Sequence, residues 1–281
     1  MPRSLYDNPL LHKFLSQIDS NIKHFGVNRS FADIARRTNR NFIVNLPSST
    51  KKSFKKDPVI LICNHPNQLE VFLLIGALPH RPNTFLMAIN NLLSIIPSFD
   101  KHIIPLFIGY RSASNSKFDW KTALINSIHY SPSFSKEESH KKNINNVKLA
   151  AKKVDQNSTV IIFPAGGSKN GRDFYSGVGY LIKNVKKYRQ AKIVFAHVTG
   201  TSIFDALRFN PHLSKFFPDI KFEFSSPLPL SAFRSQEPKQ ITAQLQSEYD
   251  KWSLPFYTVP KSTSWALYFR SLLFFLLFRG Y

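Results

Sequence analysis

Cysteine is almost absent from this chain: Cys63 is the single cysteine among 281 residues. One thiol cannot build an internal disulfide framework or a cysteine-based zinc site, so both are excluded. A single cysteine also fits a reducing compartment. The first fifteen residues contain no continuous apolar run followed by a small-residue cleavage site, and we therefore expect no secretory signal.

Acidic residues are also scarce, with 17 Asp and Glu against 38 Lys and Arg, which gives a net charge of +21. A charge of this sign indicates an anionic partner: an acidic membrane surface, nucleic acid or an acidic carrier protein. The chain also contains 26 phenylalanines. Because binding to nucleic acid requires fewer apolar side chains, we favour an anionic membrane surface over nucleic acid.

Two catalytic signatures are missing. The sequence contains no Gly-x-Ser-x-Gly elbow, which argues against a hydrolase of that class. Gly177-Val178-Gly179 lacks the third glycine and the preceding strand of a dinucleotide-binding fingerprint. We therefore expect no tightly bound cofactor.

Apolar runs alternate with amphipathic segments along most of the chain, which predicts an α/β fold with a mixed, largely parallel sheet flanked by helices. We expect strands at 59–63, 84–89, 103–108, 159–163, 192–198 and 220–224. Helices are expected at 146–154, 180–188 and 239–252, and residues 131–146 are expected to form a polar loop. We assign residues 51–260 to this domain.

A helical hairpin is predicted over residues 1–50. The first helix begins at Asn8-Pro9 and ends at Gly26, and the second begins with a capping box at Ser30 and Asp33. The apolar face of the second helix continues to Phe42. The hairpin either packs onto the domain or forms a platform that touches a membrane, and both alternatives stay open.

The candidate catalytic stretch is Asn64-His65-Pro66-Asn67-Gln68-Leu69-Glu70, directly after the apolar run 59–63. Pro66 suits the first turn of a following helix and restricts His65 to extended geometry just before it. The His65 ring can then turn towards Glu70. A carboxylate there would hold one ring nitrogen and leave the other as a general base.

This stretch resembles the His-x4-Asp motif of the glycerolipid acyltransferases, the glycerol-3-phosphate and lysophosphatidate acyltransferases, with Glu70 in place of aspartate. A second similar block is the apolar run from Ile103 to Gly109, followed by Arg111. The third is Phe163-Pro164-Ala165-Gly166-Gly167-Ser168-Lys169-Asn170-Gly171-Arg172, in which Ala165 replaces an acid and Ser168 an arginine.

The resemblance implies that His65 and Glu70 are catalytic and that Arg111 binds the phosphate of the acceptor; an ordinary surface arginine is the alternative. The third block suits an anion, because adjacent glycines let backbone N–H groups approach it. Its alternative is an ordinary tight turn. We assign substrate binding to the following residues: Arg111, Gly166, Gly167, Ser168, Lys169 and Arg172. His197, near the fourth block, is expected to be structural or to line a pocket.

The implied reaction is transfer of a fatty acyl group from acyl carrier protein or acyl-coenzyme A to a glycerol-phosphate acceptor, without a metal. We expect the protein at the cytoplasmic face of a membrane, held peripherally or in one leaflet. The alternative is a basic protein that binds membrane or nucleic acid and carries a degenerate acyltransferase site, as the changes at Ala165 and Ser168 suggest.

Residues 261–281 are expected to form a hydrophobic tail that includes an apolar C-terminal helix. The tail has fewer than the roughly 20 apolar residues of a membrane span and contains Arg270. Trp265, Tyr268 and Arg279 are typical of a membrane interface. A monotopic anchor fits this composition better than a span, and a buried terminal helix of the core is the alternative.

Overall fold

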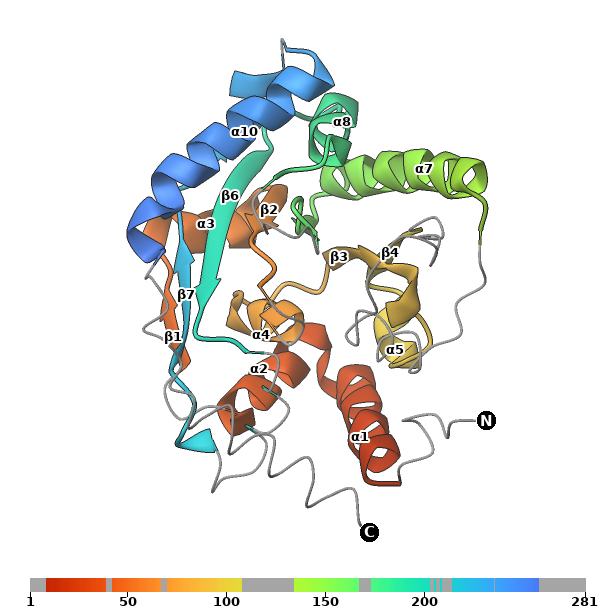
Figure 1. Ribbon diagram of the computed structural model, residues 1–281, viewed down its shortest axis with the longest axis vertical. Helices are drawn as coiled ribbons and strands as arrows, with labels where there is room; N and C mark the ends of the chain where they lie inside the picture. Colours follow the sequence, from red (N-terminus) through yellow and green to blue (C-terminus); the bar gives the residue numbers. More distant parts are fainter. Residues whose placement is uncertain are drawn as a thin grey trace, which may run out of the picture.

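The computed structural model describes residues 9–38, 42–66, 70–107, 134–166, 173–202, 205, 208, 214–234 and 236–257. Their helices and strands are shown in Figure 1. In chain order they are α1 (Pro9–Phe25), α2 (Val27–Thr38), β1 (Phe42–Asn45), α3 (Ser48–Lys56), β2 (Val59–Cys63), α4 (Glu70–Ala77), β3 (Thr84–Ile89), η2 (Asn90–Leu92), α5 (Pro97–Asp100), β4 (Ile103–Leu106), α7 (Lys136–Asp155), β5 (Thr159–Ile162), α8 (Gly177–Asn184), β6 (Lys192–Thr199), β7 (Ile220–Phe224), β8 (Leu228–Pro229), η5 (Leu230–Phe233), α10 (Pro238–Ser253) and η6 (Leu254–Phe256).

Within the described residues, eight strands form one mixed sheet in the order β1-β7-β6-β2-β5-β3-β4, with β8 paired to β6. The run from β6 to β4 is parallel throughout. Strands β7 and β8 are antiparallel to β6, and β1 is parallel to β7. The predicted α/β fold with a mixed, largely parallel sheet is confirmed. The carboxyl ends of the five parallel strands meet at one edge, where α/β proteins bind their ligands.

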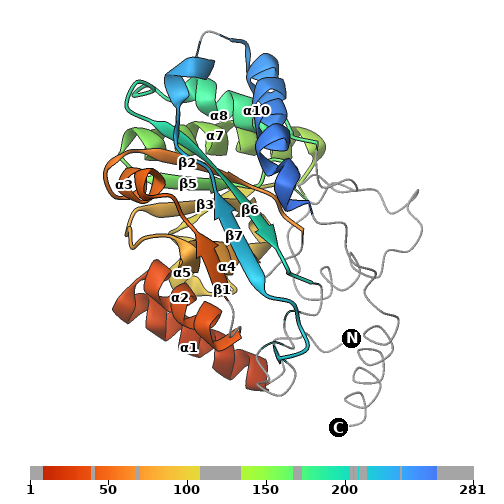
Figure 2. The same cartoon turned by 90° about the vertical axis from the view of Figure 1, so that its left-hand side faces the viewer.

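Both faces of the sheet are covered by helices. Figure 2 shows α1, α2, α4 and α5 on one side and α7, α8 and α10 on the other. Along β2, Val59, Leu61 and Cys63 belong to the core on the α2 and α4 side. Ile60 and Ile62 belong to the core on the α7 and α10 side. A strand buried on both faces has no polar alternation, which explains the uninterrupted apolar run in the sequence.

The first helix of the predicted hairpin is confirmed: α1 begins at Pro9 and ends before Gly26, whose φ of +79° suits a glycine terminator. The predicted capping box of the second helix is wrong. Helix α2 begins at Val27, so Ser30 lies inside it and its hydroxyl donates to the Gly26 carbonyl at 2.8 Å. Gly26 alone separates the two helices, in the αL conformation, which leaves no residue for a separate cap.

Phe42 does not continue the apolar face of α2, as the sequence predicted, but opens β1. Its ring packs at 5.5 Å, edge to face, on Phe222 of β7, and β1 pairs with β7. The sheet therefore starts inside the segment assigned to the hairpin. Pairing with the distant strand β7 overrides the helical pattern of this segment, and the periodicity of a short segment does not reveal such a partner.

Helix α2 packs tightly across α4, the helix that carries Glu70. A methyl group on Gly76 would come within 2.6 Å of the Phe31 backbone, so only glycine permits this crossing. The Asn28 side-chain amide also donates to the carbonyl of Ile75 at the end of α4, at 3.1 Å. Of the two predicted alternatives, packing onto the domain is therefore the one that the structure shows for α2. Its role at a membrane stays a prediction.

The polar loop predicted for residues 131–146 is wrong from residue 136 onwards, where the 20-residue helix α7 begins. Ser135 and Glu138 form a capping box at its start, a sequence signal for a helix that the composition obscured. Two asparagines of α7 hold this edge of the sheet: the Asn146 amide donates to the Pro105 carbonyl of β4 at 2.6 Å, and Asn143 exchanges two hydrogen bonds with the backbone of Phe107, directly after β4, at 2.7 and 2.8 Å.

Gly177 and Gly179 were expected to precede a helix, but both lie within α8. A methyl group on Gly179 would meet the carbonyl oxygen of Pro238 at 1.9 Å. Helix α10 therefore crosses α8 at this glycine. The predicted helix at 180–188 is correspondingly displaced towards the amino terminus.

Candidate active site

A histidine and a carboxylate meet at the carboxyl end of β2. His65 follows the strand by two residues, and its Nδ1 lies 2.6 Å from Oε1 of Glu70. The predicted pairing of these two side chains is confirmed. Pro66 lies in a bend and α4 is described only from Glu70, so the placement of Pro66 in the first helical turn is wrong. The position of His65 outside the helix nevertheless holds.

Glu70 is a fully buried carboxylate, with none of its surface exposed. It occupies the first position of α4, where the partial positive charge of a helix N-terminus stabilises an anion. The rest of α4 is apolar on nearly every side and packs into the core. The core therefore holds the helix rigidly, and the helix start holds the carboxylate against His65.

The imidazole of His65 is partly accessible, with 25% of its side chain exposed. Its ring lies 4.9 Å from the ring of Phe163, tilted by 34°, and Phe163 follows β5. With Nδ1 held by Glu70, Nε2 is the ring nitrogen that remains for proton transfer. Cys63 is no competing nucleophile: burial, with a further contribution from the Glu70 carboxylate, raises the pKa of its thiol well above the ordinary value.

The turn after β5 brings the start of the third motif block, residues 163–166, to the same edge. The Gly166 N–H donates to the carbonyl of Phe163 at 2.9 Å, and Gly166 has a φ of +51° that favours glycine. Tyr175 closes the turn by donating its N–H to the carbonyl of Pro164. Ala165 is buried, with 2% of its surface exposed, so an acidic side chain at this position would point into a dry environment.

The structure thus brings together His65, Glu70, Phe163 and Gly166. The remaining predicted site residues lie outside the described residues: Arg111, Gly167, Ser168, Lys169 and Arg172. The predicted tail at 261–281, with its apolar helix, also lies outside them. These assignments stay predictions.

Asn64 is a site residue to which the sequence attached no role. Its side-chain amide accepts a hydrogen bond from the Val198 N–H at 2.8 Å and donates to the Val198 carbonyl at 3.0 Å. The partner lies 134 positions away on β6, so no local pattern could have revealed the contact.

His197 is buried on β6, and its Nδ1 lies 3.0 Å from the Tyr249 hydroxyl. Burial lowers the pKa of His197 to about 4. A neutral imidazole packed among aromatic rings is structural, which is one of the two predicted roles, and His197 is buried whereas His65 is partly accessible.

Among the described residues, no group of three or more His, Cys, Asp or Glu side chains is placed to hold a metal ion. Within the same ranges, no helix combines the length and apolar character that crossing a membrane requires.

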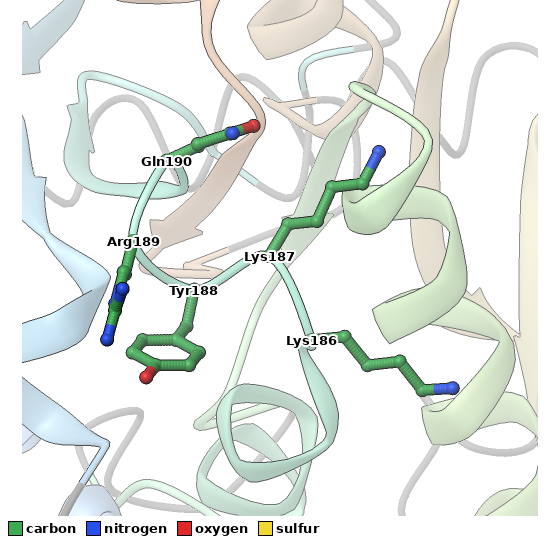
Figure 3. A pocket seen from close by; sticks show the side chains of 5 residues that line it. All are labelled: Lys186, Lys187, Tyr188, Arg189 and Gln190. Carbon is green, nitrogen blue, oxygen red and sulfur yellow. The ribbon is translucent and has the colours of Figure 1, made fainter.

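A surface cavity of about 290 Å³ lies far from this pair, on the loop of Lys186, Lys187, Tyr188, Arg189 and Gln190. The loop leads into Lys192, which pairs with Val59 at the amino end of β2, so the cavity lies at the sheet edge opposite His65. Figure 3 shows that Lys186 and Lys187 point away from Arg189. Cations that diverge do not form a site for one anion, and the candidate active site is therefore the His65 edge.

A histidine–carboxylate pair at the carboxyl edge of an α/β sheet is a candidate general base, because the carboxylate can orient the ring and leave one nitrogen for proton transfer. The family model described as Acyltransferase matches residues 41–198. This match covers more than half of the chain and includes both members of the pair, so the chain belongs to the Acyltransferase family. The predicted resemblance is confirmed at the level of the family.

Among solved structures, the chain is similar to the 1-acyl-sn-glycerophosphate (LPA) acyltransferase PlsC from Thermotoga maritima, with 13% sequence identity and a TM-score of 0.41. The similarity covers 89% of this chain and 82% of that chain. No curated protein matches the sequence.

Proposed function

We propose that this acyltransferase is a membrane-associated glycerolipid O-acyltransferase, which esterifies a hydroxyl of a glycerol-phosphate acceptor such as glycerol-3-phosphate or lysophosphatidate. The observation that carries the proposal is the 2.6 Å contact between His65 and the buried Glu70. Such a pair provides a base whose tautomer and orientation are held by a carboxylate.

In the proposed reaction, Nε2 of His65 removes the proton from the acceptor hydroxyl. The hydroxyl oxygen attacks the thioester carbonyl carbon of acyl carrier protein or acyl-coenzyme A, and the carbon–sulfur bond breaks. The thiolate leaves and takes up the proton that His65 holds. Glu70 stabilises the imidazolium that forms in between, and no covalent acyl-enzyme and no metal are required. Arg111 and the loop from Gly166 to Arg172 are proposed to hold the acceptor phosphate.

The proposed location is the cytoplasmic face of a membrane. The support is the net charge of +21, which favours an anionic lipid surface, and the apolar composition of residues 264–281. Removal of residues 264–281 should weaken binding to neutral vesicles, whereas the charge of the remaining chain should still attract anionic vesicles at low salt. Equal flotation with neutral vesicles before and after truncation would contradict a role for this segment as an anchor.

The direct experiment measures transfer of labelled acyl groups from carrier protein and from coenzyme A to a panel of acceptors. His65→Ala should lower kcat by about 10²–10⁴-fold, because a general base typically contributes that much. The exposed His140 on α7 supplies the matched control, and His140→Ala should leave the rate unchanged.

The competing proposal is a basic binding protein whose site has degenerated, which Ala165 in place of an acid favours. Absence of acyl transfer by the wild-type protein over the whole panel, together with binding to anionic vesicles or nucleic acid, would support that alternative. Near-normal transfer by His65→Ala would instead contradict the proposed mechanism.

A further inference from the structure

Strands β2 and β6 remain joined beyond their last backbone pair, because the side chain of Asn64 bonds to the backbone of β6. The last backbone pair of the two strands is Cys63 with Ala196. Beyond it, the amide of Asn64 accepts from the Val198 N–H at 2.8 Å and donates to the Val198 carbonyl at 3.0 Å. A primary amide offers an acceptor and donors together, so it can replace a peptide unit in a ladder, whereas a carboxylate can only accept.

A buried tyrosine supports the same end of β6. The Tyr249 hydroxyl, on α10, donates to the Ala196 carbonyl at 3.0 Å. Its single proton is then committed, so Nδ1 of His197 must donate to the phenol oxygen at 3.0 Å. The Asn64 side chain and the Tyr249 hydroxyl therefore hold the same stretch of β6, from Ala196 to Val198, beside the segment that precedes His65.

Asn64 is adjacent to His65 in the chain, and the exit angle of the backbone at Asn64 sets where the imidazole points. The ring must meet the fixed carboxylate of Glu70 on one side and Phe163 on the other. A catalytic group must be held to within about 0.5 Å of its productive position. If the end of β2 frayed by one residue, the displacement of the His65 ring would exceed this tolerance.

We propose that Asn64 is a positioning residue, whose bidentate contact with Val198 holds the His65 imidazole in register with Glu70. As far as catalysis is concerned, this inference rests on the proposed function. The inference also states that the Asn64–Val198 contact fixes the orientation of the His65 ring, and this statement can be tested without an activity assay.

The activity test compares Asn64→Ala and Asn64→Asp with a control. Both variants should lower kcat by about 10–100-fold with little change in the KM of acceptor and donor, because misplacement of a catalytic group by about 1 Å costs up to that much. Thr50→Val is the matched control: it removes a buried hydrogen bond from a side chain to the Ser225 carbonyl, 2.6 Å long, away from His65. It should lower the midpoint of thermal unfolding and leave kcat unchanged.

A second measurement does not depend on activity. The nitrogen chemical shifts of the His65 imidazole, recorded by NMR on protein labelled with ¹⁵N-histidine, report which nitrogen carries the proton. The wild-type protein should show a single Nδ1–H tautomer, and Asn64→Ala should show a mixture. The His65→Ala variant identifies the signals of His65.

The outcomes separate the two claims. If the wild-type protein has no transferase activity but the Asn64→Ala variant still shows mixed tautomers, the proposed function is refuted and the positioning role is upheld. An unchanged His65 spectrum in Asn64→Ala, or a kcat within about twofold of a catalytically active wild type, would overturn the inference. If Asn64→Ala fails to fold, Asn64→Asp, which can still accept from the Val198 N–H but cannot donate to the Val198 carbonyl, decides by the same two measurements.

Discussion

The charge of Glu70 can be removed with almost no change of shape, and Glu70→Gln is therefore the sharpest perturbation of the site. The carboxylate is fully buried and lies 2.6 Å from Nδ1 of His65. At an effective dielectric constant of about 20, two unit charges about 4 Å apart attract each other by about 4 kcal/mol. If the imidazolium loses this attraction in the transition state, the rate falls about a thousandfold. We expect kcat to fall by about 10²–10³-fold.

The stability of the protein should change much less than its activity. Glu70→Gln loses a favourable interaction with the α4 N-terminus, worth about 0.3–1 kcal/mol. It also removes the cost of burying a charge, which opposes that loss. The free energy of unfolding, measured in urea, should therefore change by less than about 1 kcal/mol. Such a result would indicate that the buried carboxylate serves the reaction more than the fold.

Acyl-transfer rates under saturating donor and acceptor provide the assay. Glu138→Gln is the matched control, because Glu138 is an exposed carboxylate in the first turn of another helix, α7; its kcat should equal that of the wild type. Glu70→Asp should retain part of the activity, since it restores the charge. A kcat for Glu70→Gln within about threefold of the wild type would refute the reasoning.

Three further predictions concern stability. Gly76→Ala should destabilise the fold by about 1–3 kcal/mol or more, because its methyl group would lie 2.6 Å from the α2 backbone. The control is Gly177→Ala, which should not destabilise the fold because its methyl group meets nothing within 4 Å. Urea unfolding of the two variants compares their free energies of unfolding. His197 has a folded pKa of about 4, below its unfolded value of about 6.5, so the unfolded state binds a proton first and stability falls as the pH drops from about 6.5 to 4, by up to about 3 kcal/mol. His197→Asn should flatten this part of the stability profile, and an equal slope would contradict the assignment. Asp205→Asn should cost about 3 kcal/mol or more, because it leaves the guanidinium of Arg208, buried 2.6 Å from that carboxylate, without its charge partner; unchanged thermal unfolding would be the contrary result.

The pairing of His65 with Glu70 could be predicted because the signals are local. An apolar run that ends in Asn64-His65-Pro66 places His65 at a strand end, since a proline restricts the residue before it. An acid five positions later then lies within reach of the ring. The fold class follows in the same way, because a parallel strand buried on both faces carries no polar alternation.

The errors of sequence reasoning share one physical cause. Phe42 reads as part of a helix until β7 is known to lie beside it. Gly179 reads as a residue before a helix, whereas it lies inside α8 at the point where α10 crosses. Periodicity registers neighbours within one or two turns, whereas these residues are chosen by partners far away in the chain.

By itself, the sequence predicted the candidate site: a histidine just after one strand, a carboxylate five positions later at the start of a helix, and a glycine turn after another strand. Only the tertiary structure decided how these groups are held. Asn64 finds Val198 across 134 positions, and α2 crosses α4 at Gly76. Such contacts depend on the order of strands in the sheet and on which helix covers which face. Both are set by the summed packing of the whole core, which no short segment of the chain encodes.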